Sequence, residues 1–213
     1  MSQENKDIKR SCIDCAGKGC DEKGGAYPEF CITAKMDPEF LAETMKLYTE
    51  NGENAEIMMA ASEVEFENYC KMTRVEEICE FAKKIDAKKL GIATCVGLIQ
   101  EARTAAAIFR NKGFEVVGAA CKVGAQPKVS VGIDPAHETV GINMCNPILQ
   151  AELLNKEKTD LNIVIGLCVG HDSLFYKHSE ALCTTLVTKD RVLGHNPIAA
   201  LYQADKYYSR LMK

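Results

Sequence analysis

Cysteine is the residue whose number and spacing in this sequence point most clearly to chemistry. Four cysteines near the N-terminus follow the pattern C-x2-C-x4-C-x10-C in a glycine-containing stretch: Cys12, Cys15, Cys20 and Cys31. A segment of this kind can wrap four thiolates around one centre, which suits tetrahedral zinc or an iron-sulfur cluster. We therefore predict a metal centre here. The spacing does not choose the metal, because it departs from both zinc-ribbon pairs and the bacterial ferredoxin run.

Three further cysteines each end a hydrophobic run and are closely followed by a glycine: Cys95, Cys121 and Cys168. Continuous apolar runs of this length are typical of strands buried on both faces of a parallel sheet. The carboxyl ends of parallel strands meet at one edge, where open α/β folds bind ligands. We therefore expect these thiols to share that edge.

Two matching tetrapeptides add a cysteine and a histidine to this group. Cys145 and His195 both stand directly before Asn-Pro-Ile, in which Asn caps and Pro opens a helix. The N-terminus of a helix stabilises a thiolate or a bound anion. His171 lies three residues after Cys168 and is expected at the same edge.

These residues form the second predicted site. We expect a second metal centre held by Cys95, Cys121, Cys145 and Cys168. His171 or His195 would supply a proton or an outer hydrogen bond. The plainer alternative also stands, since a cysteine at the end of a core strand often packs as a small hydrophobic residue. We interpret Cys70, Cys79 and Cys183, which lack this placement, as packing residues.

The segments that must position these side chains predict an α/β fold with a mostly parallel sheet and flanking helices. The expected strands are 90–96, 114–121, 161–168 and 182–188. The expected helices between and after them are 99–111, 147–157, about 172–178, and one that starts at 196. Earlier helices are expected over 38–50 and 54–70, and a third opens at the capping box Thr73–Glu76.

This pattern divides the chain into three parts. Residues 1–36 form a Cys-rich metal-binding segment, residues 37–88 a helical region, and residues 89–213 the α/β domain. The segment 129–138 is interpreted as a loop near the sheet edge, acting either as a lid or only as a solvent loop.

Composition excludes several classes of function. The chain has 213 residues, a net charge of -4 and no basic run, so it offers no electrostatic basis for binding nucleic acid. The absence of a long apolar stretch and the polar first residues predict a cytoplasmic protein without a membrane span. In a reducing compartment, 11 cysteines indicate metal or thiol chemistry rather than disulfides. The sequence also lacks the glycine-rich motifs of nucleotide sites and the nucleophile elbow of hydrolases.

The N-terminal cysteine pattern, the run Leu167–Asp172 (Leu-Cys-Val-Gly-His-Asp) and the run Gly194–Pro197 (Gly-His-Asn-Pro) carry a resemblance. They are similar to those of a family of uncharacterised cysteine-rich, metal-binding proteins of anaerobic bacteria and archaea. The resemblance covers nearly the whole chain. It implies metal binding through the motif cysteines and an anaerobic source, but no particular reaction.

Three functions follow as hypotheses. The first is a cytoplasmic metal-binding protein with an iron-sulfur cluster of the 4Fe-4S type and a redox or electron-transfer role. It would act with a redox partner protein or a small molecule, and a homo-oligomer is possible. The second is a zinc-stabilised binding or regulatory module. The third is a Cys-dependent sulfur or acyl transfer enzyme with Cys145 as nucleophile.

Overall fold

The structure is a computed structural model that describes residues 9–17 and 19–213. The polar first residues, on which the expectation of no signal peptide depends, lie outside the described residues. Backbone contacts divide the chain between Met59 and Ala60 into two compact units. The three-part organisation expected from the sequence stays a prediction, and each unit is described by itself.

The first unit carries short turns and the helix α1. The turns are η1 (Cys12–Asp14) and η2 (Thr33–Lys35), and α1 spans Pro38–Thr49. Asp37 caps α1, because its carboxylate accepts from the backbone N–H of Glu39 at 2.8 Å. The next helix, α2, spans Gly52–Asn68 and crosses the division between the units.

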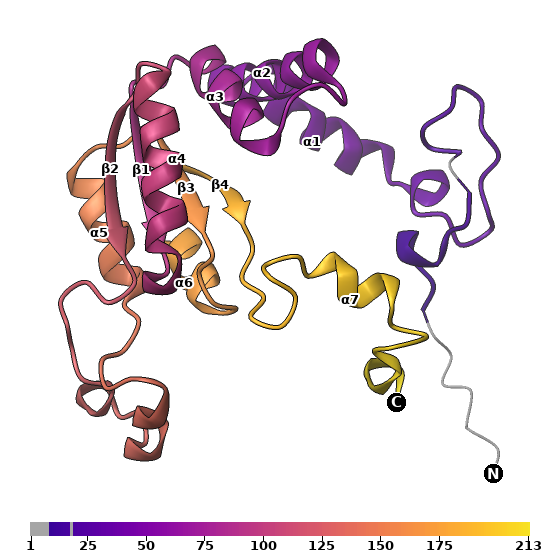
Figure 1. Ribbon diagram of the computed structural model, residues 1–213. Coiled ribbons are helices and arrows are strands. Elements are labelled where there is room, and N and C mark those ends of the chain that lie inside the picture. The colour runs from indigo at the N-terminus through magenta and orange to yellow at the C-terminus, as the bar shows by residue number, and fades with distance from the viewer. Residues whose placement is uncertain (1–8, 18) are drawn as a thin grey trace. The chain divides into compact units, whose positions relative to one another are not determined.

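The second unit contains a four-stranded, all-parallel sheet. Its strands are β1 (Lys89–Thr94), β2 (Glu115–Ala120), β3 (Leu161–Ile165) and β4 (Leu182–Val187), in the order β2-β1-β3-β4 (Figure 1). The predicted α/β fold with a parallel sheet is therefore confirmed. The strand order reverses between β1 and β3, so the carboxyl ends of these two strands flank the topological switch point.

Helices cover both faces of this sheet. They are α3 (Arg74–Lys84), α4 (Ile99–Asn111), α5 (Pro147–Lys156) and α6 (His171–His178); the short α7 (Ile198–Tyr202) follows β4 and lies away from the strands in Figure 1. In Figure 1, α4 lies in front of the strands, while α5 and α6 lie on the far side. The capping box expected at Thr73 is present and opens α3, since Glu76 accepts from the Thr73 backbone N–H at 2.8 Å.

Alternate strand residues feed two separate cores. Ile92, Ile163 and Ile165 point to the α3–α4 side, where the fully buried Phe109 also packs. Ala93 and Val164 point to the α5–α6 side. This second core contains or contacts Cys95, Cys121, Cys145 and Cys183.

One strand boundary and one packing assignment differ from expectation. β3 ends at Ile165 rather than at residue 168, because Gly166 takes a left-handed conformation with φ +62° and turns the chain. Cys168 therefore lies in a loop and not at the strand end. Cys79 is buried as predicted, but Cys70 is exposed at φ +56°, so its assignment as a packing residue was wrong.

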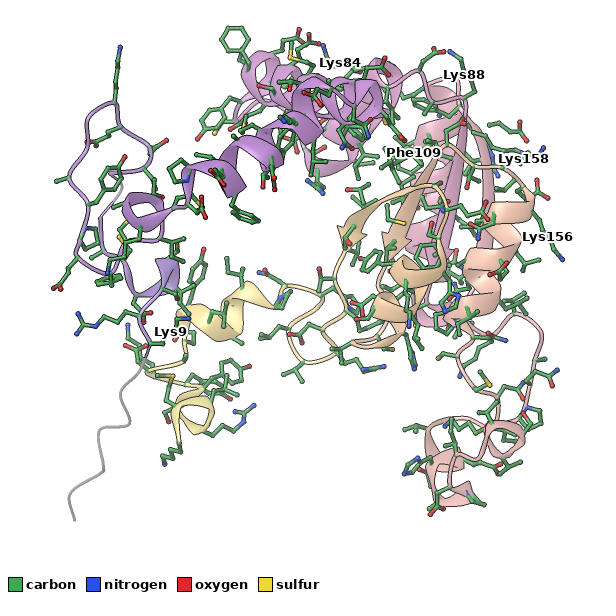
Figure 2. The ribbon with its side chains drawn as sticks, turned by 180° about the vertical axis from the view of Figure 1, so that it is seen from behind. Lys9, Lys84, Lys88, Phe109, Lys156 and Lys158 are labelled. Carbon is green, nitrogen blue, oxygen red and sulfur yellow. The ribbon has the colours of Figure 1, made fainter. Side chains whose placement is uncertain are left out.

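The two edges of the sheet carry different side chains. Lys88 and Lys158 lie at the amino edge (Figure 2), where Asp160 also accepts from the backbone N–H of Lys88 at 2.7 Å. The opposite edge, at the carboxyl ends of the strands, carries the cysteines and is called the rim below. No helix in the described ranges is long and apolar enough to cross a bilayer.

Candidate active site

Cys121 is the buried centre of the rim. It directly follows β2, and its backbone N–H donates to the Thr94 carbonyl at 2.8 Å, which extends the β1–β2 ladder by one step. Its Sγ accepts from the backbone N–H of Val96 at 3.3 Å. The side chain is 2% exposed, so Cys121 is held from two directions with almost no access to water.

A long loop brings Cys145 back to Cys121. The loop carries the turns η4 (Lys128–Val131) and η5 (Pro135–Val140) and is seen in Figure 1 between β2 and α5. Its base is closed by the Met144 N–H, which donates to the Gln126 carbonyl at 2.8 Å. The Asn146 N–H then donates to the Cys121 carbonyl at 2.7 Å, so the backbones of Cys121 and Cys145 are adjacent.

The local sequence also fixes where α5 begins. Asn146 is the N-cap and its side chain accepts from the Leu149 N–H at 3.0 Å, while Pro147 is the first helical residue. Cys145 therefore stands immediately before the N-terminus of a ten-residue helix. The positive end of the helix dipole there favours an anionic thiolate.

The two thiols form a coupled pair that shares one proton. The Cys121 thiol donates to Cys145, and this hydrogen bond is the largest cause that lowers the pKa of Cys145 from the ordinary 9.0 to about 5. The cationic groups of Lys122 and His171 lower it further, against the opposing effect of burial. The same hydrogen bond, followed by burial, raises the pKa of Cys121 far above its ordinary value. The pair therefore favours a thiolate on Cys145 and a protonated thiol on Cys121.

Lys122 is held in place beside this pair. Its Nζ donates to the Asn143 carbonyl at 2.5 Å, and Asn143 lies two residues before Cys145. The half-buried ammonium is therefore fixed between the two ends of the loop and is not a freely moving surface charge.

Cys95 joins the same group. It directly follows β1, is half-buried, and packs against the core that contains Cys121. Its charge contributes to the raised pKa of Cys121. The structure thus brings together three of the four predicted rim cysteines, Cys95, Cys121 and Cys145, and adds His171 at the start of α6.

Cys168 has a different partner. Its Sγ accepts from Nη2 of Arg191 at 2.9 Å, and its carbonyl accepts from the backbone N–H of His171 at 2.9 Å. Arg191 comes from the loop after β4, on the far side of β3 from the Cys121–Cys145 pair. Cys168 therefore belongs to the rim but lies in its own polar contact.

His195 forms hydrogen bonds within its own loop. Its Nδ1 accepts from the Asp190 N–H at 3.1 Å, and its backbone N–H donates to the Asp190 carbonyl at 2.8 Å. A neutral imidazole in this contact carries its proton on Nε2 and cannot use Nδ1 as a base or as a metal ligand. The bonds that the structure describes for His195 do not link it to the cysteine group.

Gln150 bonds to the strand ends that carry the rim cysteines. It was not identified from the sequence as a functional residue. This fully buried side chain donates from Nε2 to the Thr94 carbonyl at 3.1 Å and to the Ala119 carbonyl at 2.7 Å. It thus clamps the ends of β1 and β2, immediately before Cys95 and Cys121. Its Oε1 is buried without a hydrogen-bond partner in the described structure.

The N-terminal cysteines lie on one segment, with Cys12 and Cys20 exposed and Cys15 and Cys31 half-buried. Backbone N–H groups of Ala34 and Thr33 bond to the Cys31 sulfur and lower its pKa. A Cβ on Gly19 would lie 2.2 Å from the carbonyl oxygen of Ala26, so only glycine permits this close crossing of the backbone. Across residues 9–17 and 19–213, no three His, Cys, Asp or Glu side chains converge as a metal-binding group.

Comparison with known proteins assigns the chain to a family. The model of the family "Protein of unknown function (DUF1847)" matches residues 31–186, which is more than two thirds of the chain. The chain belongs to this family. It is also similar to "Uncharacterized protein MJ0455" of Methanocaldococcus jannaschii, with 43% identity over 180 residues that make up 84% of this chain and 92% of that protein.

The matched region covers Cys95, Cys121, Cys145 and Cys168 and, of the N-terminal set, only Cys31, while Arg191 and His195 lie beyond it. The expected resemblance to an uncharacterised family with archaeal members is thus supported. Neither description names a metal or a reaction, so metal binding stays a proposal.

Three contributors to the rim were missed in the sequence: Lys122, Gln150 and Arg191. The role of Lys122 could have been predicted from the sequence, since this residue directly follows a strand-end cysteine. The roles of Gln150 and Arg191 depend on tertiary contacts with residues far away in the sequence. Sequence spacing does not indicate such contacts.

Proposed function

We propose that this protein is a cysteine-dependent thiol–disulfide exchange enzyme in which Cys145 is the nucleophile and Cys121 is the resolving thiol. The observation that carries the proposal is the pairing of two cysteines: the Asn146 N–H donates to the Cys121 carbonyl at 2.7 Å, which holds the half-buried Cys145 beside the buried Cys121, directly before α5. Thiolates are the nucleophiles in thiol chemistry, and a neighbouring thiol that can attack the first adduct is what thiol–disulfide exchange requires.

The reaction with a disulfide substrate proceeds in two balanced steps. The Cys145 thiolate attacks one substrate sulfur, a Cys145–substrate S–S bond forms, and the other half of the substrate leaves as a thiolate. Cys121 then loses its proton and attacks Sγ of Cys145. This forms the Cys121–Cys145 disulfide and releases the second half of the substrate. One disulfide is reduced and two protein thiols are oxidised.

Thiol–disulfide exchange is favoured over acyl transfer by the groups around Cys145. Acyl transfer needs N–H donors aimed at a developing oxyanion. In this site the Val96 N–H is bonded to the Cys121 sulfur and the Asn146 N–H to the Cys121 carbonyl. A second thiol, in contrast, is already in place. The cytoplasm, where thiols remain reduced, is the compartment in which we propose that this chemistry occurs.

A limiting amount of an aromatic disulfide, 5,5′-dithiobis(2-nitrobenzoate), tests the proposal on reduced protein. We expect two thiophenolate anions to be released for each reagent molecule consumed, and peptide mapping to find a Cys121–Cys145 disulfide. Cys121→Ser should release one anion and retain a mixed disulfide on Cys145. Cys183→Ser is the matched control, because Cys183 is half-buried against the same core, and it should behave as the wild type. First reaction at any cysteine other than Cys145 would contradict the proposal.

Metal binding is a second candidate function, favoured by the N-terminal segment. The N–H bonds to the Cys31 sulfur and the close Gly19–Ala26 crossing are features that suit a thiolate-bound metal. Cys12, Cys15, Cys20 and Cys31 would hold zinc or an iron-sulfur cluster, and the segment would have to close around it.

Element analysis of protein purified without oxygen tests this candidate. Brown protein containing iron and sulfide supports the cluster, and colourless protein containing one zinc supports a structural site. Cys20→Ser should lose the metal and Cys70→Ser, which alters another exposed cysteine, should keep it. Metal-free wild-type protein would reject this candidate.

A further inference from the structure

Two basic side chains lie on the elements around Cys145. Lys122 directly follows Cys121, and its ammonium is anchored to the Asn143 carbonyl at 2.5 Å, two residues from Cys145. His171 opens α6, whose helix packs against α5. Both residues contribute to lowering the pKa of Cys145, which stands directly before the N-terminus of α5.

The acidic side chains of the neighbouring loops are engaged elsewhere. Asp172, next to His171, accepts from the Ser173 N–H at 2.8 Å. Asp190 accepts from the N–H groups of Val192 and Leu193 at 2.9 and 2.8 Å. These carboxylates accept hydrogen bonds from backbone N–H groups of their own loops. Among the residues that the structure describes, neither carboxylate forms an ion pair with Lys122 or His171. The net charge of the whole protein is -4, so any attraction of anions here is local.

Covalent modification changes the charge balance of this site. In the resting state the Cys145 thiolate balances the nearby positive charge. Once the sulfur forms a covalent bond it becomes neutral, and Lys122 and His171 then face a site without a negative charge. In a partly buried site this imbalance is reduced if the group attached to Cys145 is itself anionic.

We propose that the substrate of Cys145 is a small electrophile that bears an anionic group close to the reacting atom, and that Lys122 and His171 bind this group. The inference rests on the proposed nucleophilic role of Cys145 and names the class of its substrate. A carboxylate or an anionic outer sulfur next to the reacting centre fits this description.

A pair of alkylating reagents of equal reach tests the substrate class. Iodoacetate carries a carboxylate and iodoacetamide a neutral amide, and both form a carbon–sulfur bond to Cys145 as iodide leaves. The ratio of their rates at Cys145, read by peptide mapping of the full-length protein, cancels the fraction of thiolate. With 2-mercaptoethanol as a neutral reference thiol, we expect the ratio at Cys145 to exceed the reference ratio by roughly five-fold, as for one favourable charge contact.

Variants assign the effect to particular charges. Lys122→Gln and His171→Gln should each lower the ratio toward that of the reference thiol, and Lys122→Arg should retain it. Arg191→Gln is the matched control, because it removes a positive charge from the same rim beside Cys168, and it should leave the ratio unchanged.

Two results would overturn the inference and are distinguishable. A wild-type ratio equal to that of the reference thiol, with Cys145 reacting rapidly, would reject the anionic substrate alone. Failure of Cys145 to react with either reagent would reject the nucleophilic role and this inference together.

Discussion

The lowered pKa of Cys145 is due to its neighbours, because the thiol of an isolated cysteine is mostly protonated at neutral pH. The hydrogen bond from Cys121 and the charge of Lys122 both favour the thiolate, and burial opposes them. Cys183 shows the opposite balance, since burial raises the pKa of its thiol. Two half-buried cysteines against one core thus differ in their chemistry through their polar contacts.

Removing the charge of Lys122 should make Cys145 harder to ionise. In Lys122→Gln the pKa of Cys145 should rise toward its ordinary value, because a cation that favours the thiolate is lost. The midpoint of the pH–rate profile for iodoacetamide should move up by about one pH unit. Stopped-time alkylation with peptide mapping measures this profile. Lys158→Gln, at the amino edge, is the control, and an unchanged midpoint in Lys122→Gln would contradict the assigned role.

Gln150 should act as a clamp between two strand ends. Gln150→Leu removes both hydrogen bonds from Nε2, so the Thr94 and Ala119 carbonyls each lose a donor. We expect the free energy of unfolding in urea to fall by about 1–2 kcal/mol, with slower alkylation of Cys145. Gln100→Leu makes the same change on an exposed position of α4 and should alter stability by less than about 0.5 kcal/mol. Equal stability of the two variants would reject the clamp.

At the scale of elements, hydrophobic pattern predicted most of the fold. Continuous apolar runs located all four strands, and Asn-Pro and Asp-Pro pairs located the starts of α1 and α5. The end of β3 could not be read in this way, because Leu167 and Cys168 continue the hydrophobic run. The left-handed turn at Gly166 separates Cys168 from the strand, so the expected position of Cys168 at a strand end was wrong, while its grouping with the other rim cysteines stays a prediction.

The packing of β1 requires a glycine at position 91. A Cβ on Gly91 would lie 2.0 Å from Oδ1 of Asn162 and 2.9 Å from Cδ1 of Leu154, all in the interior. Gly91→Ala should therefore lower the free energy of unfolding by about 1–3 kcal/mol through overpacking. Chemical denaturation measures this change.

The control for this substitution is Gly118→Ala, in the edge strand β2. There the nearest atom to the new Cβ is the Ile92 carbonyl oxygen at 3.3 Å, and the position is exposed. The variant should keep nearly wild-type stability. If Gly91→Ala has the same free energy of unfolding as this control, the prediction is wrong, because the Asn162 side chain would then move aside without loss of stability.

At the scale of the whole molecule, a parallel sheet gathers cysteines that are far apart in sequence. Cys95, Cys121 and Cys145 converge because two of them follow adjacent strands and the third follows a loop pinned back to the same edge. Strand-end placement made the convergence of Cys95 and Cys121 predictable. The hydrogen bond between Cys121 and Cys145 was not predictable, because it depends on contacts between side chains that are 24 positions apart in the sequence.

The pH dependence of alkylation at each cysteine tests the account most directly. Reduced full-length protein is treated briefly with iodoacetamide between pH 5 and pH 9, and every cysteine is quantified by peptide mapping. Because the fold lowers the pKa of Cys145, its rate should stay high at pH 7 and fall only as the pH drops toward about 5. A free reference thiol such as 2-mercaptoethanol should slow as soon as the pH falls below 9, while Cys121 stays protected. A Cys145 that loses reactivity along with the reference thiol would contradict the account.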